Sequence, residues 1–254
     1  MTDEESGSAT LRGGEIENKT YDTTKNTDHS FWHSRGYLPH FDSPFAVQHV
    51  IFHLADSIPQ GAIKRIEAEL NLIEPEKRES ERRLRLNNLI DAGHGCCVLR
   101  HPEVAQMVQE TLLKFDDVRY KLFAWVVMPN HVHTLLQIND GEKLPKIIAS
   151  WKSWTGKQIA IRYRFLTTTE GGAPSVYTKR VWQREYWDRF IRDERHYVAV
   201  VNYIHDNPVR AGLVQRAEDW PWSSVSLCKK SGRTTLLDGE NEYVNATSEG
   251  GAPR

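Results

Sequence analysis

The stretch that decides the fold of this chain is WVVMPNHVHTLL, residues 125–136. Two apolar, β-branched runs flank a Met-Pro-Asn turn, a pattern that predicts a β-hairpin. Alternate residues of a strand point to the same face, so His131 and His133 should lie side by side while Val132 points into a core. Neutral imidazoles at this spacing can bind one divalent metal ion, and a pair of structural histidines is the alternative. The pair needs a third ligand and a nucleophile before it indicates a function.

Length and composition indicate one domain of ordinary size with extensions. The chain has 254 residues, 39% hydrophobic residues and a formal net charge of -1, so only a local basic surface could attract nucleic acid. Its three cysteines form neither a disulfide framework nor a zinc-binding spacing. Because no apolar leader and no run of membrane-spanning length is present, the sequence predicts a cytoplasmic protein.

Changes in composition predict three segments. Residues 1–30 are polar and acidic and are expected to be disordered, residues 31–225 to form the domain, and residues 226–254 to form a loose tail. Within the domain, a charged helical insertion is predicted at about 60–95 and a Gly-rich loop at 165–176.

Hydrophobic periodicity predicts an α+β fold. The predicted strands share β-branched, aromatic or apolar residues and lie at 47–54, 96–99, 120–127 and 132–138. The remaining predicted helices lie at 102–115, 143–163 and 193–207. Pro208 should end the last of these helices. Helices that alternate with a hairpin and a separate strand favour an antiparallel sheet with helices on one face.

A second informative stretch is VNYIHDNPV, residues 201–209. Tyr203 and Asn207 are four residues apart on the predicted helix and therefore share one face. A tyrosine phenolate is a usable nucleophile, but a pKa near ~10 means that it needs help from a metal or a base. The Asn207 carbonyl is a hard oxygen donor of the kind that Mg²⁺ or Mn²⁺ accepts. Taken alone, an amphipathic-helix tyrosine and a capping asparagine are the simpler interpretation.

Together, MPNHVH at 128–133 and YIHDNPV at 203–209 resemble the motifs of single-tyrosine HUH transposases, most closely the REP-associated tyrosine transposases of bacteria. The resemblance covers roughly residues 36–224. It implies a ferredoxin-like HUH endonuclease fold in which His131, His133 and Asn207 hold Mg²⁺ or Mn²⁺ and Tyr203 is the nucleophile.

The same resemblance implies an activity. Single-stranded DNA is cut beside a hairpin, leaving a 5′-phosphotyrosine and a free 3′-hydroxyl that can attack back. The implied protein is nucleoid-associated and works as a monomer or homodimer. The alternative is a domesticated protein that binds repeat hairpins without cleaving them.

One segment of the chain is strongly basic. Between Lys143 and Arg195, twelve lysines and arginines face five acidic residues. Clustered charge of this kind favours phosphate binding, whereas most of the interleaved tryptophans are expected to be core residues. The predicted DNA-binding residues are Lys152, Lys157, Arg162, Lys179, Arg180, Arg184, Arg189 and Arg192.

Overall fold

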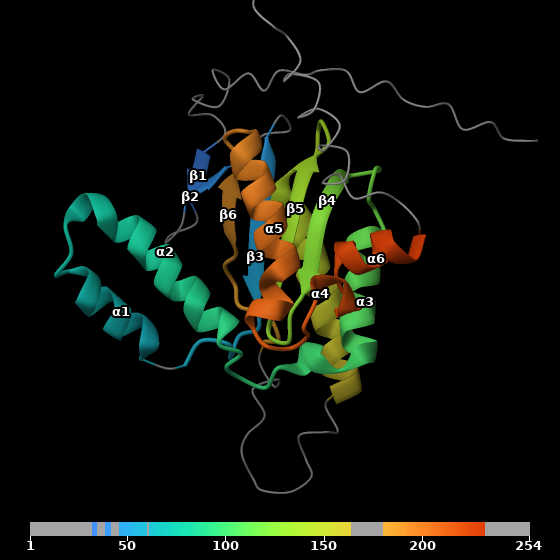
Figure 1. Ribbon diagram of the computed structural model, residues 1–254, viewed down its shortest axis with the longest axis horizontal. Coiled ribbons are helices and arrows are strands. Elements are labelled where there is room, and N and C mark those ends of the chain that lie inside the picture. Colours follow the sequence, from blue (N-terminus) through green and yellow to red (C-terminus); the bar gives the residue numbers. More distant parts are fainter. Residues whose placement is uncertain (1–31, 35–38, 42–45, 60, 164–179, 232–254) are drawn as a thin grey trace, which may run out of the picture.

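The computed structural model describes residues 32–34, 39–41, 46–59, 61–163 and 180–231. Its centre is a four-stranded sheet in the order β4-β5-β3-β6, in which every neighbouring pair is antiparallel (Figure 1). The strands are β3 (Val47–His53), β4 (Tyr120–Val127), β5 (His131–Ile138) and β6 (Trp187–Phe190), and a separate pair comprises β1 (Trp32–Ser34) and β2 (Pro39–Phe41). The predicted α+β class and antiparallel sheet are confirmed, and the arrangement is consistent with an HUH fold.

The hairpin predicted around residues 128–130 is present. Met128 N donates to His131 O at 2.9 Å and closes the turn between β4 and β5. On its other edge, β5 pairs with β3, where Ile51 lies opposite His133. The two histidines therefore lie on a central strand whose backbone is hydrogen-bonded on both sides, which fixes the direction of their side chains.

Helices cover both faces of the sheet, which corrects the expectation of helices on one face (Figure 1). The helices α3 (Pro102–Leu113) and α4 (Leu144–Tyr163) pack on the face that carries Val132. The helix α5 (Glu194–Arg210) packs on the opposite face, against Val126 and Leu135. The apolar character of residues 125–127 and 135–136 reflects this arrangement, since a strand buried on both faces need not alternate with polar residues.

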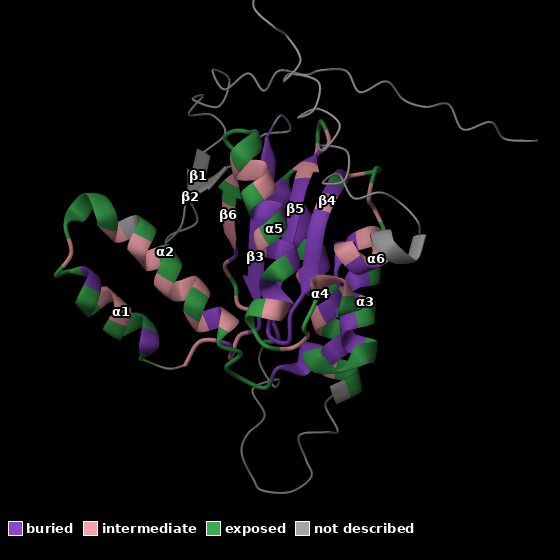
Figure 2. Ribbon diagram, in the orientation of Figure 1, coloured by how far each residue is buried: buried purple, intermediate pink, exposed green. Residues whose placement is uncertain are grey.

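The helices α1 (Ala62–Leu70) and α2 (Pro75–Asp91) form an arm beside the sheet (Figures 1 and 2). Ion pairs from Arg82 to Glu67 and from Arg85 to Glu69 join the two helices, whose surface is largely exposed. Ile90, in the last turn of α2, is buried. The arm thus meets the rest of the protein at the C-terminal end of α2.

Two local predictions are wrong. Residues 96–99 form no strand, because Cys97 has a φ of 51° and a 3₁₀ helix, η3 (Val98–Arg100), follows it. The helix α5 does not end before Pro208 and continues to Arg210. A proline in the last turn of a helix removes a single backbone donor, while Ala211 N still donates to Asn207 O at 3.0 Å.

The predicted segment boundaries can be compared with the structure only where residues are described. The helix α6 (Ser224–Ser231) continues past residue 226, where the loose tail was expected to begin. The predicted acidic tail at 1–30, the Gly-rich loop at 165–176 and residues 232–254 lie outside the described residues. No helix among the described ranges is long and apolar enough to cross a membrane.

Candidate active site

The strand β5 and the helix α5 bring together four residues that the sequence predicts for one site. Both histidines point to the sheet face that α5 covers, and α5 presents Tyr203 and Asn207 to them from consecutive turns. Asn207 Nδ2 lies 3.2 Å from His133 Nε2. The rings of Tyr203 and His133 meet edge to face, with their centroids 5.4 Å apart. Residues from the two motifs are therefore in direct contact.

Asn130 fixes the orientation of His131. Its Oδ1 lies 2.7 Å from His131 Nδ1, and its Nδ2 donates to Ile90 O at 3.0 Å and to His94 O at 3.1 Å. Because the amide nitrogen serves two carbonyls, the amide oxygen faces His131, and His131 Nδ1 must carry the ring proton. The Nε2 atom of His131 therefore presents a lone pair, 2.9 Å from His133 Nε2.

Both imidazoles are neutral because they are buried. Burial lowers the pKa of His131 to about 3, and the neighbouring His53 adds to the effect. Burial also lowers the pKa of His133 well below its ordinary value, with His131 and His49 contributing. Neutral imidazoles keep their lone pairs available for a metal ion at neutral pH.

His49, on β3, belongs to the same cluster. Its Nε2 lies 3.0 Å from His133 Nδ1, and the two rings stack with centroids 5.2 Å apart. His49 therefore orients His133 through the nitrogen that faces away from His131, as partners of metal-binding histidines commonly do.

Asp91, the last residue of α2, is a member of the site that the sequence did not reveal. Its Oδ2 accepts a hydrogen bond from the Tyr203 hydroxyl at 3.2 Å, and its Oδ1 lies 3.4 Å from His131 Nε2. Potential ligand atoms of Asp91, His131 and His133 all lie within 4.8 Å of one another. The sequence offers one weak signal, namely that Gly93 and Gly95 end the helix directly after this carboxylate.

The environment of Tyr203 keeps its phenol protonated. Burial raises the pKa of Tyr203 most, and the negative charge and hydrogen bond of Asp91 raise it further. The Arg210 guanidinium lies 4.9 Å from the centre of the Tyr203 ring and acts in the opposite direction. Arg210 reaches this position because α5 continues beyond Pro208. A nucleophilic role for Tyr203 thus requires further positive charge close to its oxygen.

The side chains at this site fit a divalent metal ion. Two neutral imidazoles are directed at each other, and the Asn207 amide can turn its oxygen toward the same point. Asp91 Oδ1 is buried and has no hydrogen-bond partner within the described part of the chain. A mixed set of nitrogen and oxygen donors suits Mn²⁺ better than Mg²⁺, which prefers oxygen ligands.

The predicted DNA-binding residues are mostly on the surface. The exposed ones are Lys157, Arg162, Arg180, Arg184, Arg189 and Arg192, whereas Lys179 lies outside the described residues. Arg189 contributes to lowering the pKa of His49, after burial, so its positive charge acts at the histidine cluster. Burial and the charges of Arg192 and Arg83 lower the pKa of Arg189 in turn. Guanidinium groups from α2, β6 and the following turn therefore influence one another electrostatically.

Of the predicted DNA-binding residues, Lys152 instead contacts backbone carbonyls. Its Nζ lies 3.1, 3.3 and 2.9 Å from the carbonyl oxygens of Gln183, Arg184 and Glu185, which use all three of its donors. Burial lowers the pKa of Lys152 to about 8. Lys152 thus holds the chain before β6 in place and has no donor left for a phosphate.

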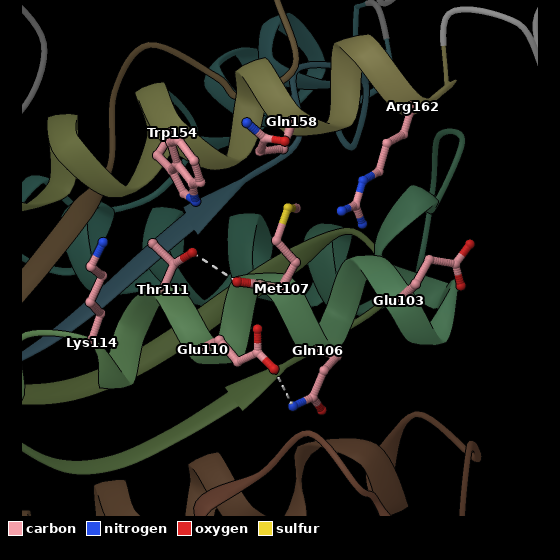
Figure 3. Close-up of a pocket in the computed structure, with 9 residues that line it drawn as sticks. All are labelled: Glu103, Gln106, Met107, Glu110, Thr111, Lys114, Trp154, Gln158 and Arg162. Atoms are coloured by element: carbon pink, nitrogen blue, oxygen red, sulfur yellow. Dashed lines mark hydrogen bonds between the residues drawn. The ribbon is translucent and has the colours of Figure 1, made fainter.

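The tryptophans interleaved with the basic residues lie partly in the core and partly on the surface. Trp151 and Trp182 are buried in the core beneath α4, as expected. Trp154 is 54% exposed and lines a groove between α3 and α4 with Lys114 and Arg162 (Figure 3). This groove lies on the sheet face opposite α5, so it is separate from the histidine cluster.

Comparisons with known proteins confirm the resemblance that the two motifs indicate. The family model described as "Transposase IS200 like" matches residues 98–207. The chain is 28% identical over 120 residues to a REP-associated tyrosine transposase of Escherichia coli (strain K12), an alignment that covers 47% of this chain and 63% of that protein. It is 31% identical over 116 residues to an uncharacterized protein of Haemophilus influenzae, covering 42% of this chain and 63% of that protein.

These curated relatives are therefore matched over less than two thirds of their own length. Among solved structures, the chain is similar to a REP-associated tyrosine transposase bound to a REP hairpin. That similarity has a TM-score of 0.48 and 18% sequence identity, and covers 78% of this chain and 87% of the other.

Proposed function

We propose that this protein is a single-stranded DNA endonuclease and strand transferase of the transposase type, which cuts beside DNA hairpins. The observation that carries the proposal is the contact between the two motifs. His131 and His133 from β5 meet Tyr203 and Asn207 from α5, with 3.2 Å between Asn207 Nδ2 and His133 Nε2. This arrangement would combine a nucleophile with a set of metal ligands.

In the proposed cleavage step, Tyr203 Oη forms a bond to the phosphorus of the scissile phosphodiester as the bond from phosphorus to the 3′ oxygen breaks. The phenol loses its proton, and the departing 3′ oxygen gains one. The products are a 5′-phosphotyrosine and a free 3′-hydroxyl. Joining is the reverse reaction with a 3′-hydroxyl as the nucleophile, so the protein–DNA bond conserves the energy of the cut and no nucleotide cofactor is needed.

Each residue of the site has a part in this proposal. His131, His133 and Asn207 would hold Mg²⁺ or Mn²⁺, which supplies positive charge that offsets the charge of the transferred phosphoryl group when bound. Asn130 and His49 keep the two imidazoles in the orientation that binding requires. Arg210 lies over the ring of Tyr203 and favours the phenolate.

The proposed partner is single-stranded DNA that contains a palindromic hairpin. The matched E. coli relative is a REP-associated tyrosine transposase, and this chain carries exposed arginines around its own site. Arg189 and Arg192 lie in and just after β6, the strand beside β3, which carries His49. Phosphates bound there would bring the strand to the histidine cluster.

The test is the formation of a covalent adduct between the protein and a labelled hairpin oligonucleotide taken from palindromes that flank the gene. The wild-type protein with Mn²⁺ should give a band that survives denaturing electrophoresis, and a chelator should prevent it. Tyr203→Phe should abolish the band while leaving oligonucleotide binding largely intact. Tyr197→Phe, which removes a hydroxyl from the same helix outside the cluster, is the matched control and should still form the adduct.

Two results would contradict the proposal. An adduct that persists in Tyr203→Phe would show that another residue is the nucleophile. Tight binding by the wild-type protein that is insensitive to chelator and never yields an adduct would instead support the non-cleaving, hairpin-binding alternative.

A further inference from the structure

One carboxylate oxygen of Asp91 is buried in the site without a hydrogen-bond partner among the described residues. Its Oδ2 accepts a hydrogen bond from the Tyr203 hydroxyl at 3.2 Å. Its Oδ1 is buried without a hydrogen-bond partner in the described ranges and lies 3.4 Å from His131 Nε2. An unsatisfied buried acceptor is costly, and more so when it is charged. The fold therefore holds this oxygen at a cost that a cation would offset.

A proton on His131 is a poor candidate for that cation. Nδ1 of His131 already carries the proton that bonds to Asn130 Oδ1, so a second proton on Nε2 would make a buried imidazolium. His131 is fully buried, and a charged imidazolium is costly to bury. The nearby cation Arg210 lies over the Tyr203 ring, and its residue is exposed. A proton would in any case satisfy one acceptor, whereas three converge here.

The end of α2 is tied to the histidine strand by Asn130. The Asn130 amide nitrogen donates to the carbonyls of Ile90 and His94, which flank Asp91 in the chain. Gly95 then reverses the chain at a φ of +91°, where an added Cβ would lie only 2.6 Å from Asp56 O. One side chain therefore sets both the proton on His131 and the position of Asp91, as a shared metal site requires.

We propose that Asp91 is a metal ligand, completing with its Oδ1 the centre formed by His131 and His133. The inference rests on the proposed function, which assigns a metal ion to those histidines. The charges support it, because one carboxylate, a divalent ion and the single negative charge of a scissile phosphodiester sum to zero in a buried site. Asp91 then connects the ion to the nucleophile, since its Oδ2 holds the Tyr203 hydroxyl. The arm formed by α1 and α2 becomes part of the active site.

The test is titration of the full-length protein with MnCl₂ by isothermal calorimetry. Asp91→Asn keeps the size of the side chain and an oxygen for Tyr203 but removes the charge, and it should weaken Mn²⁺ binding by about tenfold or more. Asp206→Asn makes the same charge change at an exposed position of α5 and should stay within about twofold of the wild type. His133→Ala should also lose most of the affinity. Thermal unfolding of each variant establishes that it is folded, and Asp91→Ser replaces Asp91→Asn if the latter is not.

The outcomes separate this inference from the function on which it rests. Normal Mn²⁺ affinity in Asp91→Asn, together with lost affinity in His133→Ala, would overturn the role of Asp91 and leave the histidine metal site intact. Equal losses in Asp91→Asn and Asp206→Asn would also overturn it, because the effect would then be one of net charge. If the wild-type protein takes up no Mn²⁺ with or without hairpin DNA, both the metal site of the proposed function and this inference fall.

Discussion

Lowering the pH from about 7.5 to about 5.5 should destabilise the protein through its buried histidines. Burial lowers the pKa of His49 and His131 to about 3, and that of His53 and His205 to about 4. In the unfolded chain these imidazoles titrate near ~6.5. Because the pKa values of the folded state lie below those of the unfolded state, this stability is fully present above about pH 6.5 and is lost as the pH falls toward about 3.

The magnitude follows from the number of imidazoles that the fold keeps neutral. One pH unit below the unfolded pKa, each of them costs about 1.4 kcal/mol of the free energy of unfolding. The four histidines together therefore cost about 5 kcal/mol at about pH 5.5, and His133 adds to the loss in the same direction. A domain of this kind has about 5–15 kcal/mol in total, so a large part of its stability should disappear.

Urea unfolding followed by tryptophan fluorescence, at both pH values and in the presence of a chelator, measures the difference. His205→Gln is the informative variant, because His205 contacts Ser224 Oγ at 2.8 Å and lies outside the metal cluster. Whatever its absolute stability, it should show a pH-dependent difference smaller by about 1.4 kcal/mol. A difference below about 1 kcal/mol in the wild-type protein would refute the neutral, buried state of the histidines.

Two further predictions concern the basic residues. Lys152→Met should lower the free energy of unfolding by about 1–3 kcal/mol, because three carbonyls lose their donor. It should leave oligonucleotide binding unchanged. A stable variant that binds DNA weakly would show that Lys152 belongs to the DNA-binding surface. Arg192→Ala should weaken hairpin binding and reduce the slope of log K against log salt by about 0.7–1 in fluorescence anisotropy. Arg216→Ala is the matched control, since Arg216 is already paired with Asp219, and equal slopes for both variants would argue against Arg192 as a phosphate contact.

The parts of the fold that could be predicted are those where local pattern and tertiary structure agree. The apolar runs around residues 128–130 form a hairpin because they are buried on both faces of the sheet. The helix that carries Tyr203 begins where expected because the Asp193 side chain accepts a hydrogen bond from His196 N at 2.8 Å. The contact between the two motifs could be predicted only when both motifs were considered together. Neither motif alone specifies that α5 packs on β5.

The parts that could not be predicted depend on contacts between distant segments. Asp91 ends a charged helix whose composition indicates a solvated surface. Hydrogen bonds from Asn130 to the chain around it, and from the Tyr203 hydroxyl to its carboxylate, hold it beside the histidines. Lys152 has the sequence context of a surface lysine, yet the chain before β6 passes over its amine. Charge clusters identify candidates for binding, but they cannot distinguish a side chain that meets solvent from one that satisfies buried carbonyls.

The aromatic segment Trp220–Ser224 explains how α5 is held at a fixed distance from the histidines. It covers the free edge of β4, where Val127 N donates to Trp222 O at 2.9 Å and the indole of Trp220 donates to Val127 O at 3.0 Å. These bonds satisfy backbone groups that an edge strand would otherwise leave open. The segment thereby becomes an extension of the sheet.

The same segment packs on α5 through Trp220 and also contacts it through the Ser224 hydroxyl. Ser224 Oγ accepts a hydrogen bond from Trp125 N at 3.1 Å and lies 2.8 Å from His205 Nε2. His205 occupies the turn of α5 between Tyr203 and Asn207, so the edge of the sheet is tied to the part of the helix that carries the nucleophile and the amide. A shift of this contact would move both residues together relative to His133. The distance of Tyr203 and Asn207 from His133 therefore depends on a contact between Ser224 and His205, neither of which is a reactive group of the site.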